Sequence, residues 1–317
     1  MAITYGQPGA EIQLLHGCPS EINCFSDIKI QLEKSQKQLS VDKKHFFDVL
    51  PERIRNEKTK LDNLKNIRGD IEKQWDETIV SIQKSIESNR WKFWKYIDLT
   101  IKKHFSKPKA IRKADANIQQ QMSVINALEV DPEGVFSKEK NELLSYINKL
   151  DSIVQGPEYW GAYGEITVLH ELQKLDDRYH IICDVNIHLR DYVRYRGERN
   201  LKSAQMDFVV VGPTGIYVME VKNWSSDQVN HHIGLNPHEQ VDRAGMVLWI
   251  YLKKHSFFYK PRVTNLLVPV KGNIGYNPYY KSVLIRNPRG VVKFVNENRN
   301  NVLDENRVFK VVKLLQR

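Results

Sequence analysis

The segment that most constrains the fold is QMDFVVVGPTGIYVMEVKNW, at residues 205–224. Two apolar runs, Phe208–Val211 and Ile216–Met219, flank the tetrapeptide Gly-Pro-Thr-Gly. β-Branched and aromatic residues on either side of such a turn predict a β-hairpin. Both faces of this hairpin are apolar, so it needs a covering layer on each side, as in an α/β sandwich.

The end of this hairpin carries polar residues with a specific spacing. If the turn is centred on Pro213-Thr214, Asp207 faces Glu220, Gln205 faces Lys222, and all four side chains share one face. Opposed carboxylates about 5 Å apart repel each other unless a hard cation such as Mg²⁺ binds between them. A lysine beside that cation suits hydrolysis of phosphodiesters. The same tripeptide is also compatible with an ordinary Glu–Lys pair at a solvated strand end.

Five short motifs occur in order along the second half of the chain: GAYGE at 161–165, QMD at 205–207, GPTGI at 212–216, EVKNW at 220–224 and NPHEQ at 236–240. Together they resemble the nuclease-related domain (NERD) family, a branch of the PD-(D/E)xK nuclease-like folds. The resemblance runs from about Gly156 to Arg317 and is weak after Lys254. Ser225-Ser226 departs from it, because the family usually has a glycine shortly after the tryptophan.

The resemblance implies a metal-dependent nuclease, with DNA favoured over RNA, that serves in DNA processing or defence. Its Mg²⁺ or Mn²⁺ ligands would be Asp207, Glu220, the Val221 carbonyl and Glu165. Lys222 would activate water or steady the scissile phosphate, and the neighbouring groups would be oriented by Gln205 and Gln240. The alternative is a non-catalytic nucleic-acid-binding or scaffold module that retains the fold.

Two of these residues also have a simpler interpretation. We expect Glu165 in the first turn of a helix that follows a linker at 156–160, where the helix dipole favours an acid in any case. Gln240 is expected in the first turn of a helix that begins at Asn236-Pro237, where it is equally compatible with a surface glutamine. Further strands are predicted at 262–270, 282–285 and 291–295, and a closing helix at 304–316.

The first half of the chain predicts a different architecture. Residues 1–25 are rich in Gly and Pro and are interpreted as an irregular leader. Residues 26–155 predict an α-helical arm, because apolar residues recur at steps of three or four in narrow seams. Such seams favour antiparallel coiled-coil packing or self-association, and an ordinary helical bundle is equally compatible. Pro51 is expected to break or kink the first helix. Residues 156–317 would form the nuclease-like domain.

Two basic segments are candidate nucleic-acid contacts. Residues 89–113 hold nine basic residues against one acid, interleaved with aromatic residues, and its candidate contacts are Lys92, Lys95, Lys102 and Lys103. This composition is compatible with base stacking, with a membrane interface, and with a solvated hairpin tip. The second segment is an expected loop at 190–199, which is either a phosphate contact or an exposed connection, and its candidates are Arg194, Arg196 and Arg199.

The totals agree with a polyanion-binding protein. The formal charge is +10, and residues 156–317 hold 23 basic against 16 acidic residues. Such an excess attracts nucleic acid. The three cysteines form no closely spaced framework, so we expect a reducing, cytoplasmic location. We expect neither a signal peptide nor a membrane span, because no apolar run approaches about 18 residues.

Overall fold

The computed structural model describes residues 1–88, 97, 100–101, 109–224, 236–255, 262–297 and 302–316. These residues form two compact units. We call residues 1–32 with 149–317 the sheet unit, and residues 33–148 the helical unit. This division differs from the boundaries expected at 25/26 and 155/156, because the first residues of the chain pack with its C-terminal half.

The sheet unit contains a mixed sheet of six strands among the described residues, in the order β1-β2-β3-β4-β5-β6. The strands are β1 (Ile3–Tyr5), β2 (His180–Tyr195), β3 (Glu198–Gly212), β4 (Gly215–Asn223), β5 (Val263–Lys271) and β6 (Val283–Ile285). The central strands β2, β3 and β4 are antiparallel to one another. The pairs β1–β2, β4–β5 and β5–β6 are parallel. The α/β fold class is therefore confirmed.

The predicted hairpin is present as β3 and β4. Gly212 pairs with Gly215 and Phe208 with Met219, so the turn is the predicted Pro213-Thr214 dipeptide. Gly215 has φ +142°, a backbone conformation that side chains other than hydrogen rarely allow. A two-residue connection fixes the register of both strands.

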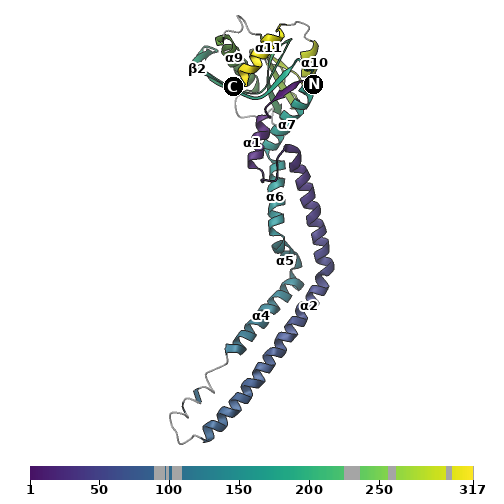
Figure 1. Cartoon of the computed structure of the whole chain (residues 1–317), viewed down its shortest axis with the longest axis vertical. Helices are drawn as coiled ribbons and strands as arrows, with labels where there is room; N and C mark the ends of the chain where they lie inside the picture. The colour runs from purple at the N-terminus through teal and green to yellow at the C-terminus, as the bar shows by residue number, and fades with distance from the viewer. Residues whose placement is uncertain are drawn as a thin grey trace. The chain divides into compact units, whose positions relative to one another are not determined.

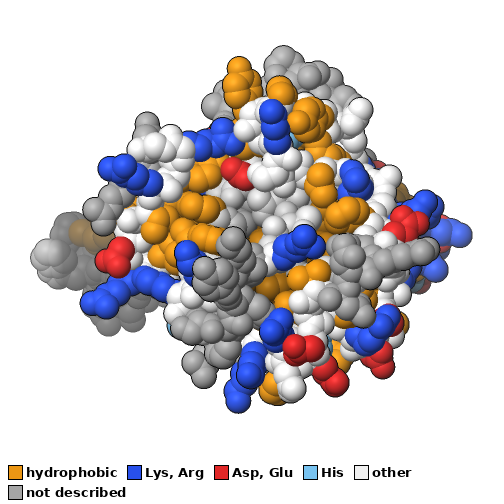
Figure 2. All heavy atoms as spheres, turned by 90° about the horizontal axis from the view of Figure 1, so that it is seen from above, with side chains coloured by type: hydrophobic (Ala, Val, Ile, Leu, Met, Phe, Trp, Pro, Cys, Tyr) orange, Lys and Arg blue, Asp and Glu red, His pale blue; other side chains and the backbone are white. Residues whose placement is uncertain are grey.

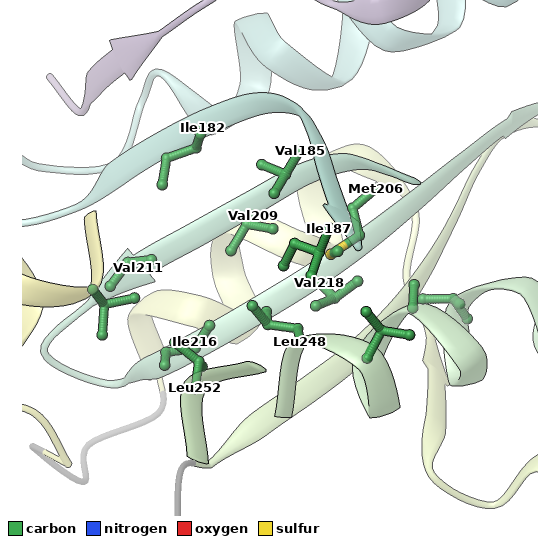
Figure 3. Close-up of a cluster of buried hydrophobic side chains, with 14 of the residues drawn as sticks. Ile182, Val185, Ile187, Met206, Val209, Val211, Ile216, Val218, Leu248 and Leu252 are labelled. Carbon is green, nitrogen blue, oxygen red and sulfur yellow. The ribbon is translucent and has the colours of Figure 1, made fainter. Parts of the chain in front are cut away.

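Apolar layers cover both faces of the sheet, as the hairpin requires. On one face, side chains such as Val209 and Val218 pack against α9 (Pro237–Lys254) and α11 (Glu305–Leu315). Figure 3 shows this layer, in which Leu248 of α9 lies beside the strands. On the other face, a second buried cluster joins the sheet to α7 (Pro157–Leu172) and α10 (Pro288–Glu297).

Helix α10 corrects one prediction, because a strand was expected at 291–295. Val291 and Val295 are buried at a spacing of four residues, which suits one face of a helix. The Asn287 side chain accepts a hydrogen bond from the Gly290 N–H at 2.7 Å and so satisfies a donor in the first turn. A short run rich in valine does not by itself distinguish a strand from a buried helix.

The first 25 residues are not the irregular leader that was expected. Strand β1 adds to the sheet edge beside β2, and the Ile3 N–H donates to the Tyr179 carbonyl at 3.0 Å. Helix α1 (Gly9–Gly17) lies against α7 (Figure 1). Phe25 then stacks on Tyr159, with ring centroids 4.6 Å apart. A strand of three residues and a helix of nine are too short to produce a clear sequence period.

The helical unit is a set of antiparallel helices (Figure 1). Its elements belong to α2 (Phe25–Ser88), α4 (Lys109–Val130), α5 (Pro132–Glu139) and α6 (Asn141–Gln155). The long helix α2 pairs with α4 through Lys58–Glu129 at 2.7 Å and Arg68–Asp115 at 2.8 Å. The order of these contacts shows that the two helices run in opposite directions. Self-association through this unit remains a prediction.

Pro51 does not end α2, which is continuous through it. The residue is exposed, so the helix loses one backbone hydrogen bond at a position that water can reach. Buried contacts hold the helix close to this position in the sequence: Phe46 packs with Leu128 and Phe136 of the neighbouring helices. Tertiary packing therefore outweighs the local preference against proline.

Charge and hydropathy of the described surface limit two further interpretations. Lys92, Lys95, Lys102 and Lys103 lie outside the described residues, so their nucleic-acid contacts remain predictions. On the face drawn in Figure 2, Lys and Arg side chains are scattered among hydrophobic and acidic ones rather than gathered in one patch. Within the described ranges, no helix is long and apolar enough to cross a bilayer.

Candidate active site

A cavity of about 630 Å³ opens at the end of the β3–β4 hairpin, between the sheet and helices α1 and α7. The structure brings the predicted site residues together in its wall, namely Glu165, Gln205, Asp207, Glu220, Val221, Lys222 and Gln240. They come from four elements: α7, β3, β4 and α9. The cavity therefore gathers residues from the separate motifs into one place.

The hairpin register explains the position of Asp207. The last pair of the β3–β4 ladder is Phe208 with Met219, so Asp207 and Glu220 are the next opposed residues. The Asp207 Oδ2 atom accepts a hydrogen bond from the Val221 backbone N–H at 2.6 Å. Its carboxylate is therefore fixed to the opposite strand at the point where the backbone ladder stops.

The expected pairing of Gln205 with Lys222 is wrong, because the ladder does not continue that far. Gln205 pairs with Asn186 on β2, and its side-chain amide donates to Asp184 Oδ1 at 2.6 Å. Lys222 instead pairs with Pro269 on the parallel strand β5. Both residues still line the same cavity.

Lys222 forms a buried ion pair with Glu220. Its Nζ atom lies 2.6 Å from Glu220 Oε1, and the two side chains are 17% and 3% exposed. Burial raises the pKa of Glu220, and the charge of Asp207 raises it further, whereas Lys222 lowers it. One lysine therefore balances only part of the negative charge in this cluster.

Asp207 is subject to the same effect. Burial raises the pKa of its carboxyl above the ordinary value, against the hydrogen bond from Val221 and the charge of Lys222. A cluster that holds two buried carboxyl groups this close favours either a bound proton or a bound cation.

Glu165 is placed by a longer helix than the sequence predicted. Helix α7 begins at Pro157, with Gly156 preceding it, so the expected linker at 156–160 forms its first turn. Proline is well suited to this position because its missing N–H has no partner there. Glu165 therefore lies beyond the first turns, and the helix dipole does not account for it.

A glycine lets α7 approach the end of β4. A Cβ atom on Gly164 would lie 2.8 Å from the Asn223 Cβ atom, so a larger residue would push the helix and strand apart. Asn223 also donates from Nδ2 to the Trp160 carbonyl at 2.6 Å. This close approach brings Glu165 to the cavity that contains Lys222. Burial raises the pKa of Glu165 to about 8, and the Asp207 charge adds to this effect.

Sequence reasoning missed the contribution of residues 1–25 to this site. Gly9, Ala10 and Gln13 of α1 line the cavity. The Ala10 backbone N–H donates to Glu165 Oε2 at 3.0 Å. A backbone donor has no residue signature, so no motif could have indicated it.

Asp184 is a second missed residue. It lines the cavity and has φ +51°, a left-handed conformation that costs energy for most residues but less for aspartate. Gly9 approaches it closely, since a Cβ there would lie 2.8 Å from Asp184 Oδ1. The available signal was a lone acid within the apolar strand segment at 181–187.

Three arginines were predicted at an exposed loop, but residues 190–199 instead form a hairpin of β2 and β3. Its turn contains Arg196 and Gly197, with φ of +50° and +92°. The Arg196 guanidinium lies 4.0 Å from the Tyr280 ring centroid and donates to the Tyr279 carbonyl at 2.7 Å. Arg194 is exposed, and the side chain of Arg199 is outside the described residues. Arg196 is therefore engaged by the protein itself.

The donor set suits a cation that keeps much of its hydration. Among the residues described, no three His, Cys, Asp or Glu side chains are grouped so that they could hold one metal ion. Mg²⁺ commonly takes one or two carboxylates and fills its remaining positions with water and phosphate oxygens. The buried carboxylates of Asp207 and Glu220 fit this requirement.

The α/β sheet and its cavity of acids beside a lysine define the class of protein: an α/β domain with a charged site at the end of a central hairpin. Residues 160–270 match the family described as NERD, the nuclease-related domain. This match confirms the resemblance seen in the motifs, and it covers the segment from α7 to β5. No curated protein and no solved structure gave a significant match.

Proposed function

We propose that this protein hydrolyses phosphodiester bonds of nucleic acid with the help of Mg²⁺ or Mn²⁺, with DNA as the favoured substrate. The observation that carries the proposal is the buried Glu220–Lys222 pair beside Asp207 in an open cavity. The nuclease-related family of residues 160–270 supports the same class of reaction.

Asp207 and Glu220 would hold the cation, with the Val221 carbonyl as a further oxygen ligand and Glu165 as a fourth candidate. A divalent cation in such a site makes a bound water more acidic and stabilises charge on a phosphate. Lys222 has three donors and would hydrogen-bond a non-bridging phosphate oxygen as negative charge grows there.

The remaining residues would position these groups. Glu165, held by the Ala10 N–H, is placed to accept a proton from the attacking water. Gln205 fixes Asp184 through its amide, and Gln240 reaches the same cavity from α9. Both glutamines would orient groups at the edge of the reaction rather than take part in proton transfer.

A non-catalytic nucleic-acid-binding module is the second candidate. The observation in its favour is that the described residues offer no cluster of three metal-ligating side chains. The helical unit would serve either candidate as an arm for self-association or for a partner protein.

One experiment separates the two candidates. The purified protein is incubated with labelled single-stranded DNA, duplex DNA and RNA, in Mg²⁺, in Mn²⁺ and in EDTA, and the products are resolved on a gel. The nuclease proposal expects cleavage that requires the cation. Binding without cleavage of any substrate in either metal would favour the second candidate.

A further inference from the structure

Two tryptophans lie at the wall of the same cavity as the acids. Trp160 is in the first turns of α7 and Trp224 follows the end of β4. Trp160 is 37% exposed, which is unusual for so large an apolar side chain beside charged groups. The proposed hydrolysis uses neither indole.

Trp160 is held in place rather than loosely exposed. Its ring contacts Tyr159, with centroids 5.6 Å apart and an interplanar angle of 89°. It also contacts Tyr163, at 5.8 Å and 73°. Its backbone carbonyl accepts the hydrogen bond from Asn223. The indole is therefore a fixed aromatic surface at the cavity.

Each tryptophan has a lysine beside it. The Lys271 Nζ atom lies 3.9 Å from the Trp160 ring centroid, and the Lys222 Nζ atom lies 5.5 Å from that of Trp224. Lys271 itself is exposed and lines the cavity. Its flexible stem lets the ammonium move from the ring to a phosphate without a change of backbone.

We infer that Trp160 and Lys271 form a binding site for an unpaired nucleotide, with the base stacked on the Trp160 indole and the ammonium of Lys271 on an adjacent phosphate. Aromatic surfaces interleaved with cations bind single strands in this way, because every base has a π-face. Bases inside a duplex are already stacked and present no free face. The preferred ligand is therefore a single strand or a frayed end; its identity as nucleic acid rests on the proposed function.

The test measures binding rather than turnover. Full-length protein in EDTA is titrated with three fluorescein-labelled probes: a short oligo-dT strand, a strand of equal length with abasic sites throughout, and a blunt hairpin duplex. The abasic strand has the same phosphates but no bases, so it isolates the contribution of stacking. The variants are Trp160→Leu, Trp160→Phe and Lys271→Ala. Phe309→Leu is the matched control, because Phe309 is 62% exposed on α11 and does not line this cavity.

The site predicts a distinct pattern for each variant. Trp160→Leu weakens oligo-dT binding about tenfold and leaves abasic binding unchanged. Trp160→Phe retains most of the affinity, and Phe309→Leu retains all of it. Lys271→Ala weakens binding of both strands and lowers the log–log salt slope by about 0.7.

Equal losses for oligo-dT and the abasic strand in Trp160→Leu, or no loss at all, would overturn the inference. Tighter binding of the duplex than of oligo-dT would also overturn it. If Trp160→Leu does not fold, photocrosslinking of a 5-iodouracil strand to the wild-type protein decides, since the crosslink must map to the peptide that contains Trp160. Base-dependent binding without cleavage in Mg²⁺ or Mn²⁺ would reject the proposed hydrolysis and leave this site standing.

Discussion

The backbone N–H of Ala10 donates a hydrogen bond to the Glu165 carboxylate at 3.0 Å, between residues 155 positions apart in the sequence. Ala10 is the second residue of α1, in the turn where backbone donors have no partner within the helix. The start of the chain therefore supplies a fixed donor to the candidate active site.

Ala10→Pro removes this single donor. Proline is tolerated in the first turn of a helix, so α1 should persist. A hydrogen bond to a charged group contributes about 1.5–3 kcal/mol, and we expect cleavage to fall about tenfold or more. Gel-based cleavage rates, with thermal melting as the folding check, measure the effect. Ala10→Ser retains the N–H and is the control; equal losses in both variants would show that the donor is not responsible.

Replacement of Lys222 by Ala should reduce divalent-dependent cleavage by about a hundredfold or more, because the charge that balances Glu220 and the phosphate donor are both removed. Asp207→Asn should have an effect of similar size through loss of a cation ligand. Lys293→Ala is the matched control, since the Lys293 side chain is 73% exposed on α10. Wild-type rates in the Lys222 variant, or undiminished cleavage in EDTA, would rule out the proposed site.

The hairpin and the opposition of Asp207 and Glu220 could be predicted from the sequence because both follow from local rules. A Gly/Pro turn fixes the register, and the period of two residues then fixes which side chains share a face. The pairing of Gln205 with Lys222 failed because it assumed that the ladder continues. The Asp207 side chain instead bonds the Val221 N–H, which a rule about backbone pairs does not include.

The other missed features depend on contacts between distant parts of the chain. Strand β1 gains its hydrogen-bond partners only at the edge of β2, where Ile3 pairs with His180. The left-handed backbone of Asp184 and the close approach of Gly9 are likewise set by packing. Such positions carry no period and no turn signature, so the sequence alone indicates only loops.

The contribution of β1 and α1 leads to a prediction about truncation. A protein of residues 156–317 lacks both elements, so the edge of β2 and the face of α7 that contacts α1 become exposed. We expect it to melt at a lower temperature than a protein in which residues 1–32 are joined to 149–317 by a Gly/Ser linker. Thermal melting compares the two. Equal melting temperatures would show that the first 32 residues add nothing to the sheet unit.

The basic segment at 89–113 provides a salt-dependence test. Lys92, Lys95, Lys102 and Lys103 changed together to Ser should weaken duplex DNA binding. For every phosphate interaction that the change removes, the log–log salt slope should fall by about 0.9. Fluorescence anisotropy between about 50 and 200 mM salt, where such slopes are resolved, measures it. An unchanged slope would assign these lysines to a solvated surface.

The last prediction concerns the stability cost of the acid cluster. Burial and Asp207 raise the pKa of Glu220 to about 8 from 4.5. The folded state therefore binds more protons than the unfolded state in this range, so without a cation the fold is most stable below 4.5 and loses stability as the pH rises towards 8.

Glu220→Gln removes this charge and keeps the shape of the side chain, while Asp207 and Glu165 remain to balance Lys222. In EDTA at pH about 8, the variant should be more stable than wild type, on the order of 1 kcal/mol. Mg²⁺ should stabilise wild type by mass action and leave the variant nearly unchanged, because a ligand is removed. Glu297→Gln, at a side chain that is 67% exposed, is the control. Thermal melting in EDTA and in excess Mg²⁺ measures both effects. A lower melting temperature for Glu220→Gln in EDTA, or an equal gain from Mg²⁺, would mean that Glu220 does not hold the cation.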